Sequence, residues 1–361
     1  MIVDRRPLPH LDLPLLGGIL ALCGIGLVTL YSVSQGGREF WTQVYWLPVG
    51  LVALTVCLLV DYRSLSDRSL ILYGLLIVGL LLVWQFGVVR GGSRRWLSLA
   101  GVTVQPSEFG RIVVALVLAA FYGENRRSAR TAGQLVGGAL LVGLPAYLIY
   151  RQPDLGTAVT LVPVFVGIVF VAGLPLRWMA AAVVAGLLFS PVVWMYGLQD
   201  YQRERIETFL DPSNDPRGAG YQQIQAKITV GSGGLTGKGF GAGTQSSYGF
   251  MPEAHNDFVF SSFAEEFGFV GVLVTLALYL FVLVRSVDAA RLSRDRVGAF
   301  LVVGLVSGFG FQVLYNLSMS AGFAPVKGLT LPLMSYGGSS LVSTLAAFGL
   351  ILNVRMRRFS N

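Results

Sequence analysis

Apolar residues occur along this 361-residue chain in long runs that short polar stretches interrupt. A helix needs roughly 20 apolar residues to cross the hydrocarbon core of a membrane, whereas the strands of a membrane barrel alternate apolar and polar residues. The runs therefore predict an all-α integral membrane protein that forms a single polytopic domain over residues 1–361. About ten transmembrane helices are expected, at residues 13–33, 42–60, 69–88, 107–123, 135–150, 156–173, 176–197, 258–284, 297–317 and 330–354.

The longest polar stretch, residues 198–257, lies between predicted helices 7 and 8. Its end is rich in glycine: residues 227–260 contain eight glycines, together with Lys238, His255 and Asp257. Glycine lets main-chain N–H groups approach a ligand closely, and consecutive N–H groups form concavities that bind anions such as phosphates. The alternative is a mobile loop without a site. Because acidic residues follow at the start of an apolar helix, we expect a long, partly re-entrant loop that carries a functional site.

Composition agrees with a membrane protein. Hydrophobic residues make up 54% of the chain and charged residues 13%, whereas soluble proteins typically contain about 25% charged residues. A net charge of +8 would suit a nucleic-acid-binding protein, but basic residues of membrane proteins gather in cytoplasmic loops. We therefore expect membrane lipids as surroundings and no nucleic-acid partner. Cys23 and Cys57 lie in apolar runs, which predicts free thiols. The first run is expected to stay as a span, because no small-residue cleavage site follows it.

Lysine and arginine indicate the orientation. With the N-terminus inside the cell, the inner segments hold fifteen of the 27 basic residues, the short outer loops hold six and the long loop holds five. Basic residues are enriched in short cytoplasmic loops, and long loops count little. Both termini are therefore predicted to be cytoplasmic, and the glycine-rich loop to lie outside the cytoplasmic membrane.

Some outer arginines oppose this bias. Arg90, Arg94 and Arg95 cluster before residues 96–108, and each needs a reason to be on the outer side. They could lie at the membrane interface with their stems buried, which costs little. We favour the alternative, in which these arginines, Arg94 and Arg95 among them, and the five basic residues of the long loop face an anionic, lipid-linked substrate from outside.

A polar motif, Gln105-Pro106-Ser107-Glu108, precedes the fourth span. Ser107 could cap this helix, and Arg111 is three residues from Glu108, on the same helical face. Charges inside a span cost about 2.5–3.5 kcal/mol each at the helix centre. An ion pair here must therefore face protein or water, so we expect Glu108 and Arg111 to line a cavity.

Two further breaks in the apolar pattern are candidate site segments. At residues 151–157, Asp154 could cap the next helix after Pro153 ends the previous one. At residues 331–340, a proline and paired glycines interrupt an apolar run that contains Ser335. Backbone freed at membrane depth must line protein or water, which predicts a broken or re-entrant helix. We find neither His/Cys ligand spacing nor a phosphate-binding Walker loop.

Together these stretches resemble the SEDS family (shape, elongation, division and sporulation), which includes the RodA and FtsW proteins, and the short termini are more similar to RodA. The resemblance covers residues from about 93 to 340 in family order, through SRRWLSLAGVTVQPSEFGR, RQPDLGTA, ITVGSGGLTGKGFGAGTQ, FMPEAHNDFVFSSFAEEFGFVG and LPLMSYGGSS. It implies a ten-helix enzyme of the bacterial cytoplasmic membrane, a peptidoglycan glycosyltransferase for cell elongation and shape. Such an enzyme joins lipid II units into glycan strands on the outer face, alongside a class B penicillin-binding protein.

The resemblance also implies roles for single residues. The essential aspartate of the family falls on Asp257, which would be the base that deprotonates the acceptor hydroxyl. A diphosphate leaving group needs neutralisation by outer cations, and a divalent cation (Mg²⁺ or Mn²⁺) commonly assists. The residues expected to bind substrate are Glu108, Arg111, Arg94, Arg95, Asp154, Lys238, Gln245, His255 and Ser335, and no protein metal ligands are predicted.

Two departures and three alternatives remain open at this point. The family usually has lysine at Arg111 and threonine at Asn256, and an arginine is harder to deprotonate than a lysine. Asp257 could also be an ordinary N-cap of the following helix. The whole protein could be a lipid II flippase, or a non-catalytic scaffold of the cell-wall synthesis complex.

Overall fold

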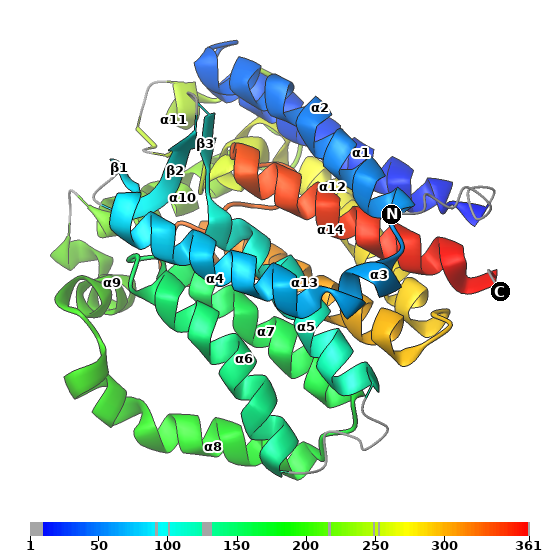
Figure 1. The fold of residues 1–361 in the computed structure, drawn as a ribbon. Helices are drawn as coiled ribbons and strands as arrows, with labels where there is room; N and C mark the ends of the chain where they lie inside the picture. The colour runs from blue at the N-terminus through cyan, green and yellow to red at the C-terminus, as the bar shows by residue number, and fades with distance from the viewer. Residues whose placement is uncertain are drawn as a thin grey trace.

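The computed structural model describes residues 10–90, 93–99, 102–124, 132–215, 218–247, 250–251 and 253–359. Most of these residues are helical, and the long helices form one bundle from which α8 (Leu176–Val192) stands apart (Figure 1). The helices that match the predicted spans are α1 (Leu13–Val33), α2 (Arg38–Leu59), α4 (Ser69–Phe86), α5 (Gly110–Glu124), α6 (Ala132–Tyr150), α7 (Leu155–Val171), α8 (Leu176–Val192), α12 (Val259–Arg291), α13 (Arg296–Ser320) and α14 (Gly338–Met356).

Every predicted span thus coincides with a helix, but not all are equally long. Eight helices in the described part of the chain have the length and hydropathy to cross a membrane. The other two, α7 and α8, are apolar helices of 17 residues each. The mostly helical membrane fold is confirmed, while the number of spans, ten, stays a prediction.

The connecting segments contain structure that the apolar pattern did not reveal. The long loop holds α9 (Asp200–Leu210), α10 (Ala219–Ser232) and α11 (Thr244–Ser247), with a 3-10 turn at Pro212–Asn214. The remaining short elements are α3 (Tyr62–Asp67), a π-helical turn at Val193–Gly197, and 3-10 turns at Pro106–Phe109 and Arg357–Phe359.

A small antiparallel sheet is the one departure from an all-helical fold among the described residues. Strands β1 (Val88–Arg90), β2 (Ser93–Leu99) and β3 (Val102–Val104) follow one another in space as in sequence. Val89 pairs with Arg94, and Ser98 pairs with Thr103. Two of the strands have only three residues, too few for a period-two pattern to stand out in the sequence.

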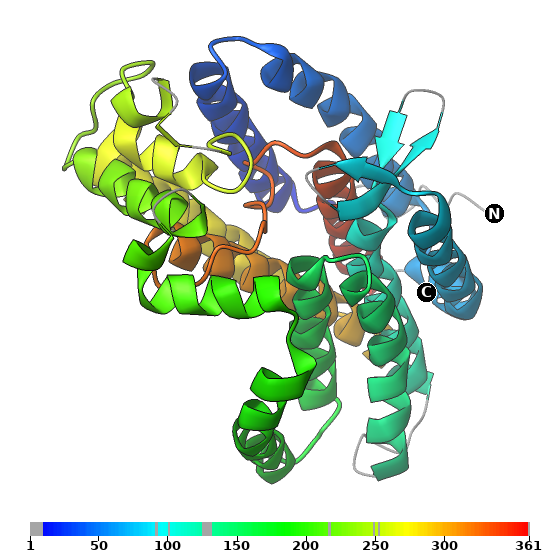
Figure 2. The same cartoon turned by 90° about the vertical axis from the view of Figure 1, so that its left-hand side faces the viewer.

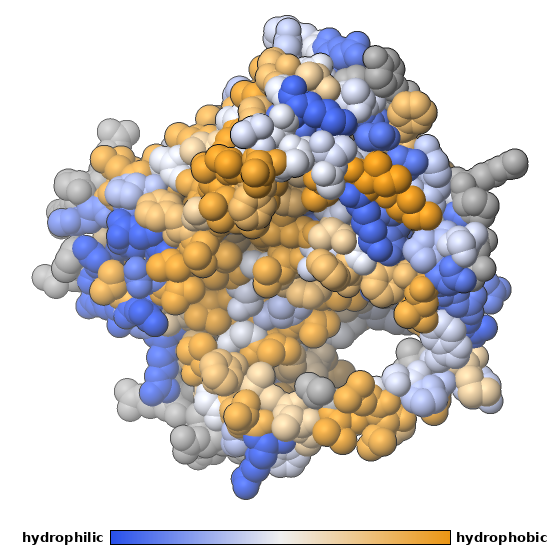
Figure 3. Space-filling view, turned by 180° about the vertical axis from the view of Figure 1, so that it is seen from behind, coloured by the Kyte–Doolittle hydropathy of each residue, from blue (hydrophilic) through white to orange (hydrophobic). Residues whose placement is uncertain are grey.

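The helix α13 lies inside the bundle, where it packs against α5, α7 and α12, while α14 packs along α2. In the most apolar stretch of α14, 83% of the residues are buried. This helix therefore lies in the interior, although its sequence resembles that of an ordinary span. Apolar residues also cover the outside: Figure 3 shows a broad apolar band between two groups of hydrophilic residues. That band is the surface a bilayer would cover, since lipid solvates apolar side chains.

The two ends of the bundle differ. The sheet, α10 and α11 lie at one end, and α3 and the C-terminal helix end lie at the other (Figure 1). In a second view, the segment that precedes α14 crosses the middle of the first end without forming a helix (Figure 2). The predicted span 330–354 is therefore wrong at its start, because α14 begins at Gly338. The broken backbone predicted for residues 331–340 is confirmed.

The glycine-rich loop occupies a break in α12. At Gly268 the backbone has φ 63°, and the helix is kinked there. The N–H groups of Lys238 and Gly239 donate to the carbonyls of Glu265 and Glu266, both at 3.0 Å. On the other side of the break, the N–H groups of residues 269 and 270 donate to carbonyls of residues 234 and 235 at 2.9 and 3.1 Å. The loop thus satisfies the backbone groups that the kink leaves free, as a low-dielectric environment requires.

Gly237→Ala should destabilise the protein more than Gly241→Ala. Both glycines have positive φ, 80° and 72°, so an added side chain strains each backbone by about 1–3 kcal/mol. At Gly237 a Cβ would also lie 2.1 Å from the Glu266 carbonyl oxygen, whereas at Gly241 it would meet nothing within 4 Å. Thermal unfolding in detergent should rank the wild type above Gly241→Ala and Gly237→Ala last. Equal melting temperatures for the two variants would show that Gly237 is not packed closely against the kink in α12.

Candidate functional site

Asp257 lies in the turn that leads into α12, and its side chain does not cap that helix. The N-cap position belongs to Phe258, and no described side chain makes a capping hydrogen bond there. Instead, the backbone of this turn is fixed by Asn316, whose Nδ2 donates to the carbonyls of Asp257 at 2.9 Å and Leu329 at 2.7 Å. The capping interpretation of Asp257 is therefore wrong, and its carboxyl is left for another role.

The surroundings of Asp257 favour a proton acceptor near neutral pH. Burial raises the pKa of the Asp257 carboxyl to about 7, and the negative charge of Glu253 adds to this effect, while Arg205 and Arg95 oppose it. A carboxyl that binds its proton weakly could not remove one from a hydroxyl efficiently, whereas a pKa close to the working pH suits a general base.

Beside Asp257 is a pocket that three cations line. Arg95 comes from β2, Arg205 from α9 and Lys327 from the segment before α14. Burial lowers the pKa of the Lys327 ammonium, and the charge of Arg205 lowers it further. Cations that are partly desolvated and that repel one another favour the binding of an anion, which would restore the charge balance.

Arg95 is held in place by the segment 151–157. Its guanidinium lies 3.7 Å from the Asp154 carboxylate and donates to the carbonyl of Pro153. Asp154 also caps α7, since its carboxylate accepts from the N–H of Thr157 at 3.2 Å. The predicted cap at Asp154 is confirmed, and the same carboxylate orients a cation of the pocket.

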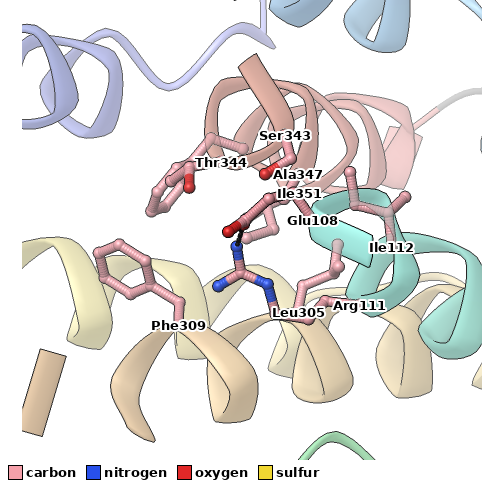
Figure 4. A pocket seen from close by; sticks show the side chains of 10 residues that line it. Glu108, Arg111, Ile112, Leu305, Phe309, Ser343, Thr344, Ala347 and Ile351 are labelled. Carbon is pink, nitrogen blue, oxygen red and sulfur yellow. Dashed lines mark hydrogen bonds and ion pairs between the residues drawn. The ribbon is translucent and has the colours of Figure 1, made fainter. Parts of the chain in front are cut away.

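A second, small pocket is lined by the Glu108–Arg111 pair and by mostly apolar side chains. Figure 4 shows the Arg111 guanidinium directed at the Glu108 carboxylate, with Phe309 on one side and Ser343 and Thr344 above. The two charged groups are 2.9 Å apart, and their side chains are 13% and 10% exposed, so the predicted ion pair is confirmed. Arg111 also donates to the Oε1 atom of Gln312.

Gln105 connects the two pockets. Its Nε2 donates to Asp154 at 3.0 Å and to Ser107 at 3.1 Å, and its backbone N–H donates to the Ser339 hydroxyl at 3.1 Å. Ser107 therefore receives a hydrogen bond, while the 3-10 turn that it belongs to has no side-chain cap. The three motifs around Glu108, Asp154 and Ser335, far apart in sequence, meet at one end of the bundle.

Lys238 and Gln245 lie around a different carboxylate. The Lys238 ammonium is 2.6 Å from Glu265, and the N–H groups of Thr244 and Gln245 donate to the same oxygen at 3.0 and 3.1 Å. Glu265 itself has an exposed fraction of 0%. Lys238 and two N–H groups of the glycine-rich loop thus bind an internal anion, a glutamate of α12, while the binding of a substrate phosphate by this loop stays a prediction.

The other predicted site residues vary in position. Arg94 is exposed, because successive side chains of β2 point to opposite faces and Arg95 takes the inner one. The His255 ring packs edge-on against Tyr336 with centroids 5.8 Å apart. Ser335 is buried, and its hydroxyl accepts from the N–H of Leu331 at 2.8 Å, which closes the turn of the broken segment.

The family model of the cell cycle proteins FtsW, RodA and SpoVE matches residues 14–359. The chain belongs to this family. It is 38% identical to the peptidoglycan glycosyltransferase MrdB of Escherichia coli (strain K12) over 97% of this chain and 94% of that protein. Among solved structures, RodA of Thermus thermophilus, a rod shape determining protein, is 31% identical and superimposes with a TM-score of 0.74 over 97% of this chain and 98% of RodA.

A second solved structure comes from a peptidoglycan synthase complex and concerns the structural coordination of polymerization and crosslinking. It superimposes with a TM-score of 0.85 at 34% identity, over 97% of this chain and 99% of that one. The bundle described above is therefore the fold of the FtsW, RodA and SpoVE family.

The sequence placed Arg205 among the five long-loop cations expected to face the substrate without singling it out, and it counted Lys327 only as a loop charge. It also missed three amides: Gln105, Gln312 and Asn316. Gln312 and Asn316 are four residues apart on an otherwise apolar helix, so they share one face. Buried amides inside a span need partners, and that spacing was the signal that could have identified them.

Removing one partner of the Glu108–Arg111 pair should destabilise the protein more than removing both. Breaking a buried pair costs about 3–5 kcal/mol because the remaining charge stays buried without a partner. Melting temperatures should therefore fall most for Glu108→Gln and for Arg111→Gln, and less for the double variant. The control is Asp288→Asn, since Asp288 pairs with Arg291 on the surface at 3.8 Å and such pairs contribute about 0–1 kcal/mol. Silent single variants would mean that the pair is solvated.

Proposed function

We propose that this chain is a peptidoglycan glycosyltransferase that polymerises lipid II into glycan strands. Its family membership and its similarity to a peptidoglycan glycosyltransferase support the reaction class. The observation that carries the proposal is the proximity of a mostly buried carboxyl of raised pKa, Asp257, to a pocket lined by Arg95, Arg205 and Lys327. Glycosyl transfer from a lipid diphosphate needs both a base and a site for an anionic leaving group.

In this mechanism Asp257 removes the proton from the 4-hydroxyl of the acceptor sugar. The hydroxyl oxygen forms a bond to the anomeric carbon of the donor, and the bond between that carbon and the donor diphosphate breaks. The bonding electrons leave on the diphosphate, whose added negative charge the three cations of the pocket stabilise. The proton stays on Asp257 until solvent accepts it.

The described residues of this site do not form a cage for a resident divalent cation. The described residues contain no group of three or more His, Cys, Asp or Glu side chains that could hold a metal ion. The carboxylate of Asp154 is already bound to Gln105, Arg95 and the N–H of Thr157. We therefore assign the neutralisation of the leaving group to the protein's own cations and derive no step through Mg²⁺ or Mn²⁺.

The second pocket does not suit the diphosphate of a substrate. Its lining is mostly aliphatic and aromatic, and its one cation, Arg111, is already paired with Glu108 among the described residues. We infer that Glu108 and Arg111 hold this part of the site together, through their ion pair and through the contact of Arg111 with Gln312.

The site is proposed to face the outside of the bacterial cytoplasmic membrane, with both termini in the cytoplasm. Fifteen of the 27 basic residues support this orientation, and the site residues are all at the end of the bundle opposite to the C-terminal end of α14. A class B penicillin-binding protein is the proposed partner. Similarity to a synthase complex that coordinates polymerization and crosslinking supports a crosslinking enzyme in that role.

The orientation is tested by labelling single cysteines in whole cells. Ser213 is exposed beside α9, and Ser293 lies in the connection between α12 and α13. An impermeant thiol reagent should label Ser213→Cys and leave Ser293→Cys unlabelled until the cells are opened, in a background that lacks Cys23 and Cys57. The reverse pattern would put the site in the cytoplasm.

The chemistry is tested with Asp257→Asn, in the presence of the partner and lipid II. Asparagine keeps the size of the side chain but cannot act as a carboxylate base, so polymerisation should fall by about a hundredfold or more. Because only the ionised carboxyl accepts the proton, wild-type activity should rise as pH increases through about 7, the pKa of Asp257.

Stability provides the control for this variant. The pKa of Asp257 is raised from 3.8 to about 7 on folding, so ionisation weakens the folded state as pH rises through that window. The melting temperature of Asp257→Asn at pH 8 should thus equal or exceed that of the wild type. Normal polymer from this variant would remove Asp257 from the chemistry. If the unmodified protein moved lipid II across liposome membranes without forming polymer, it would be a flippase. If it showed neither activity, it would be a scaffold.

A further inference from the structure

The non-helical segment before α14 depends on side chains from other helices for its backbone hydrogen bonds. Tyr279 of α12 donates its hydroxyl to the carbonyl of Pro332 at 2.6 Å. Gln312 of α13 donates to the carbonyl of Thr330 at 2.9 Å. In a region that excludes water, such bonds decide where an irregular segment can lie, because each unsatisfied backbone group costs several kcal/mol.

Gln43 of α2 makes the most complete of these contacts. Its Nε2 donates to the carbonyl of Ser335 at 3.1 Å, and its Oε1 accepts from the N–H of Gly337 at 3.1 Å. The side chain is 2% exposed. A primary amide is a donor at one end and an acceptor at the other, so one side chain satisfies both groups that flank Tyr336. One turn further along α2, Trp46 packs where a Cβ on Gly338 would lie, 2.5 Å from Nε1.

Tyr336, whose two neighbours in the chain bind Gln43, contacts the segment that carries Asp257. The N–H of Tyr336 donates to the carbonyl of His255 at 3.0 Å, two residues before Asp257. The His255 ring also packs edge-on against the Tyr336 ring. The position of Tyr336 therefore bears on the turn that holds the proposed base.

The same segment also contacts the other half of the site. Just after Gly337, the Ser339 hydroxyl accepts from the N–H of Gln105, and Ser340 is 3.2 Å from Thr330. Gln105 in turn binds Asp154, which orients Arg95. A shift of residues 335–340 would thus move the base and the cationic pocket relative to each other.

We propose that Gln43 is a positioning residue for glycosyl transfer: from α2 it fixes residues 335–337 and thereby the distance between Asp257 and the cationic pocket. This inference rests on the proposed function, because it assigns Gln43 a part in that reaction. Gln43 touches no reacting group, so its effect is on geometry. A misplacement of about 1 Å can reduce the rate about a hundredfold.

The first test is Gln43→Met, which keeps the length of the side chain and removes both hydrogen bonds. We expect kcat for lipid II polymerisation to fall about tenfold to a hundredfold while KM changes less than about twofold. Amide hydrogen exchange of the peptide over residues 331–341 should become faster, because the N–H of Gly337 loses its acceptor.

A matched control is Asn353→Leu. Asn353 of α14 is also a buried amide against α2, where its Nδ2 donates to the carbonyls of Cys57, Leu58 and Val60 at 3.1, 2.6 and 2.6 Å, at the other end of the interface. This variant should lower the melting temperature without changing kcat of the folded protein or exchange over residues 331–341. An equal fall in kcat for Asn353→Leu would mean that any damage to the α2–α14 interface has this effect, and would overturn the inference.

The second test is Gln43→Glu, which remains informative if Gln43→Met does not fold. A protonated glutamate can donate to Ser335 and accept from Gly337 as glutamine does, whereas the ionised form has no donor. Of the described residues that line the pocket next to Gln43, Cys23 alone is titratable. We expect near-normal activity at neutral pH and an additional loss at alkaline pH, which the wild type should not show.

The outcomes separate this inference from the proposed function. Unchanged kcat and exchange in Gln43→Met, or a wild-type pH profile in Gln43→Glu, would overturn the role of Gln43 alone. Absence of polymerisation by the unmodified protein with its partner would overturn the proposed function, and the role of Gln43 in it, even if exchange over residues 331–341 responds to the substitution.

Discussion

Backbone groups that leave a helix inside a membrane must find other hydrogen-bond partners, and this constraint governs the end of the bundle where the site lies. Two breaks occur there, at Gly268 in α12 and in the segment before α14. The glycine-rich loop satisfies the first through backbone-to-backbone bonds. The second depends on the side chains of Gln43, Tyr279, Gln312 and Asn316. The amides scattered through apolar helices are therefore the supports of an irregular segment.

The charged groups of the site follow from the same arrangement, because irregular backbone and polar side chains satisfy one another. Asp154 binds Arg95, Gln105 and the start of α7, and Glu265 is held by Lys238 and two N–H groups of the loop. Asp257 is the contrast: its backbone is fixed by Asn316, while the pKa of its carboxyl is raised to about 7. A base must be positioned without being fully paired, and Asp257 fits that description.

The geometry also accounts for an arginine at position 111. Its guanidinium binds Glu108 through one nitrogen and Gln312 through another, and Gln312 binds the carbonyl of Thr330. A planar guanidinium can span two acceptors in fixed directions, whereas an ammonium is a point charge. Arg111 thus links α5 to the segment before α14 through α13, which is a structural use of the charge rather than proton transfer.

The sequence alone determined the long helices, because each needs only a run of apolar residues. It indicated the Asp154 cap and the Glu108–Arg111 pair through their local spacing, whereas Asp257 was proposed as the base through the family resemblance. Ion pairs three residues apart and caps at a helix start are local, so spacing sufficed for them. The sequence could not decide what the glycine-rich loop binds: its N–H groups hold Glu265, an internal anion, because the kink at Gly268 brings α12 into the loop. Nor could it join Gln43 to Ser335 or bring the charge of Arg205 near Asp257. These arrangements depend on how the helices pack. Only the tertiary structure decided them, because a buried polar group needs a hydrogen-bond partner and packing determines which one lies within reach.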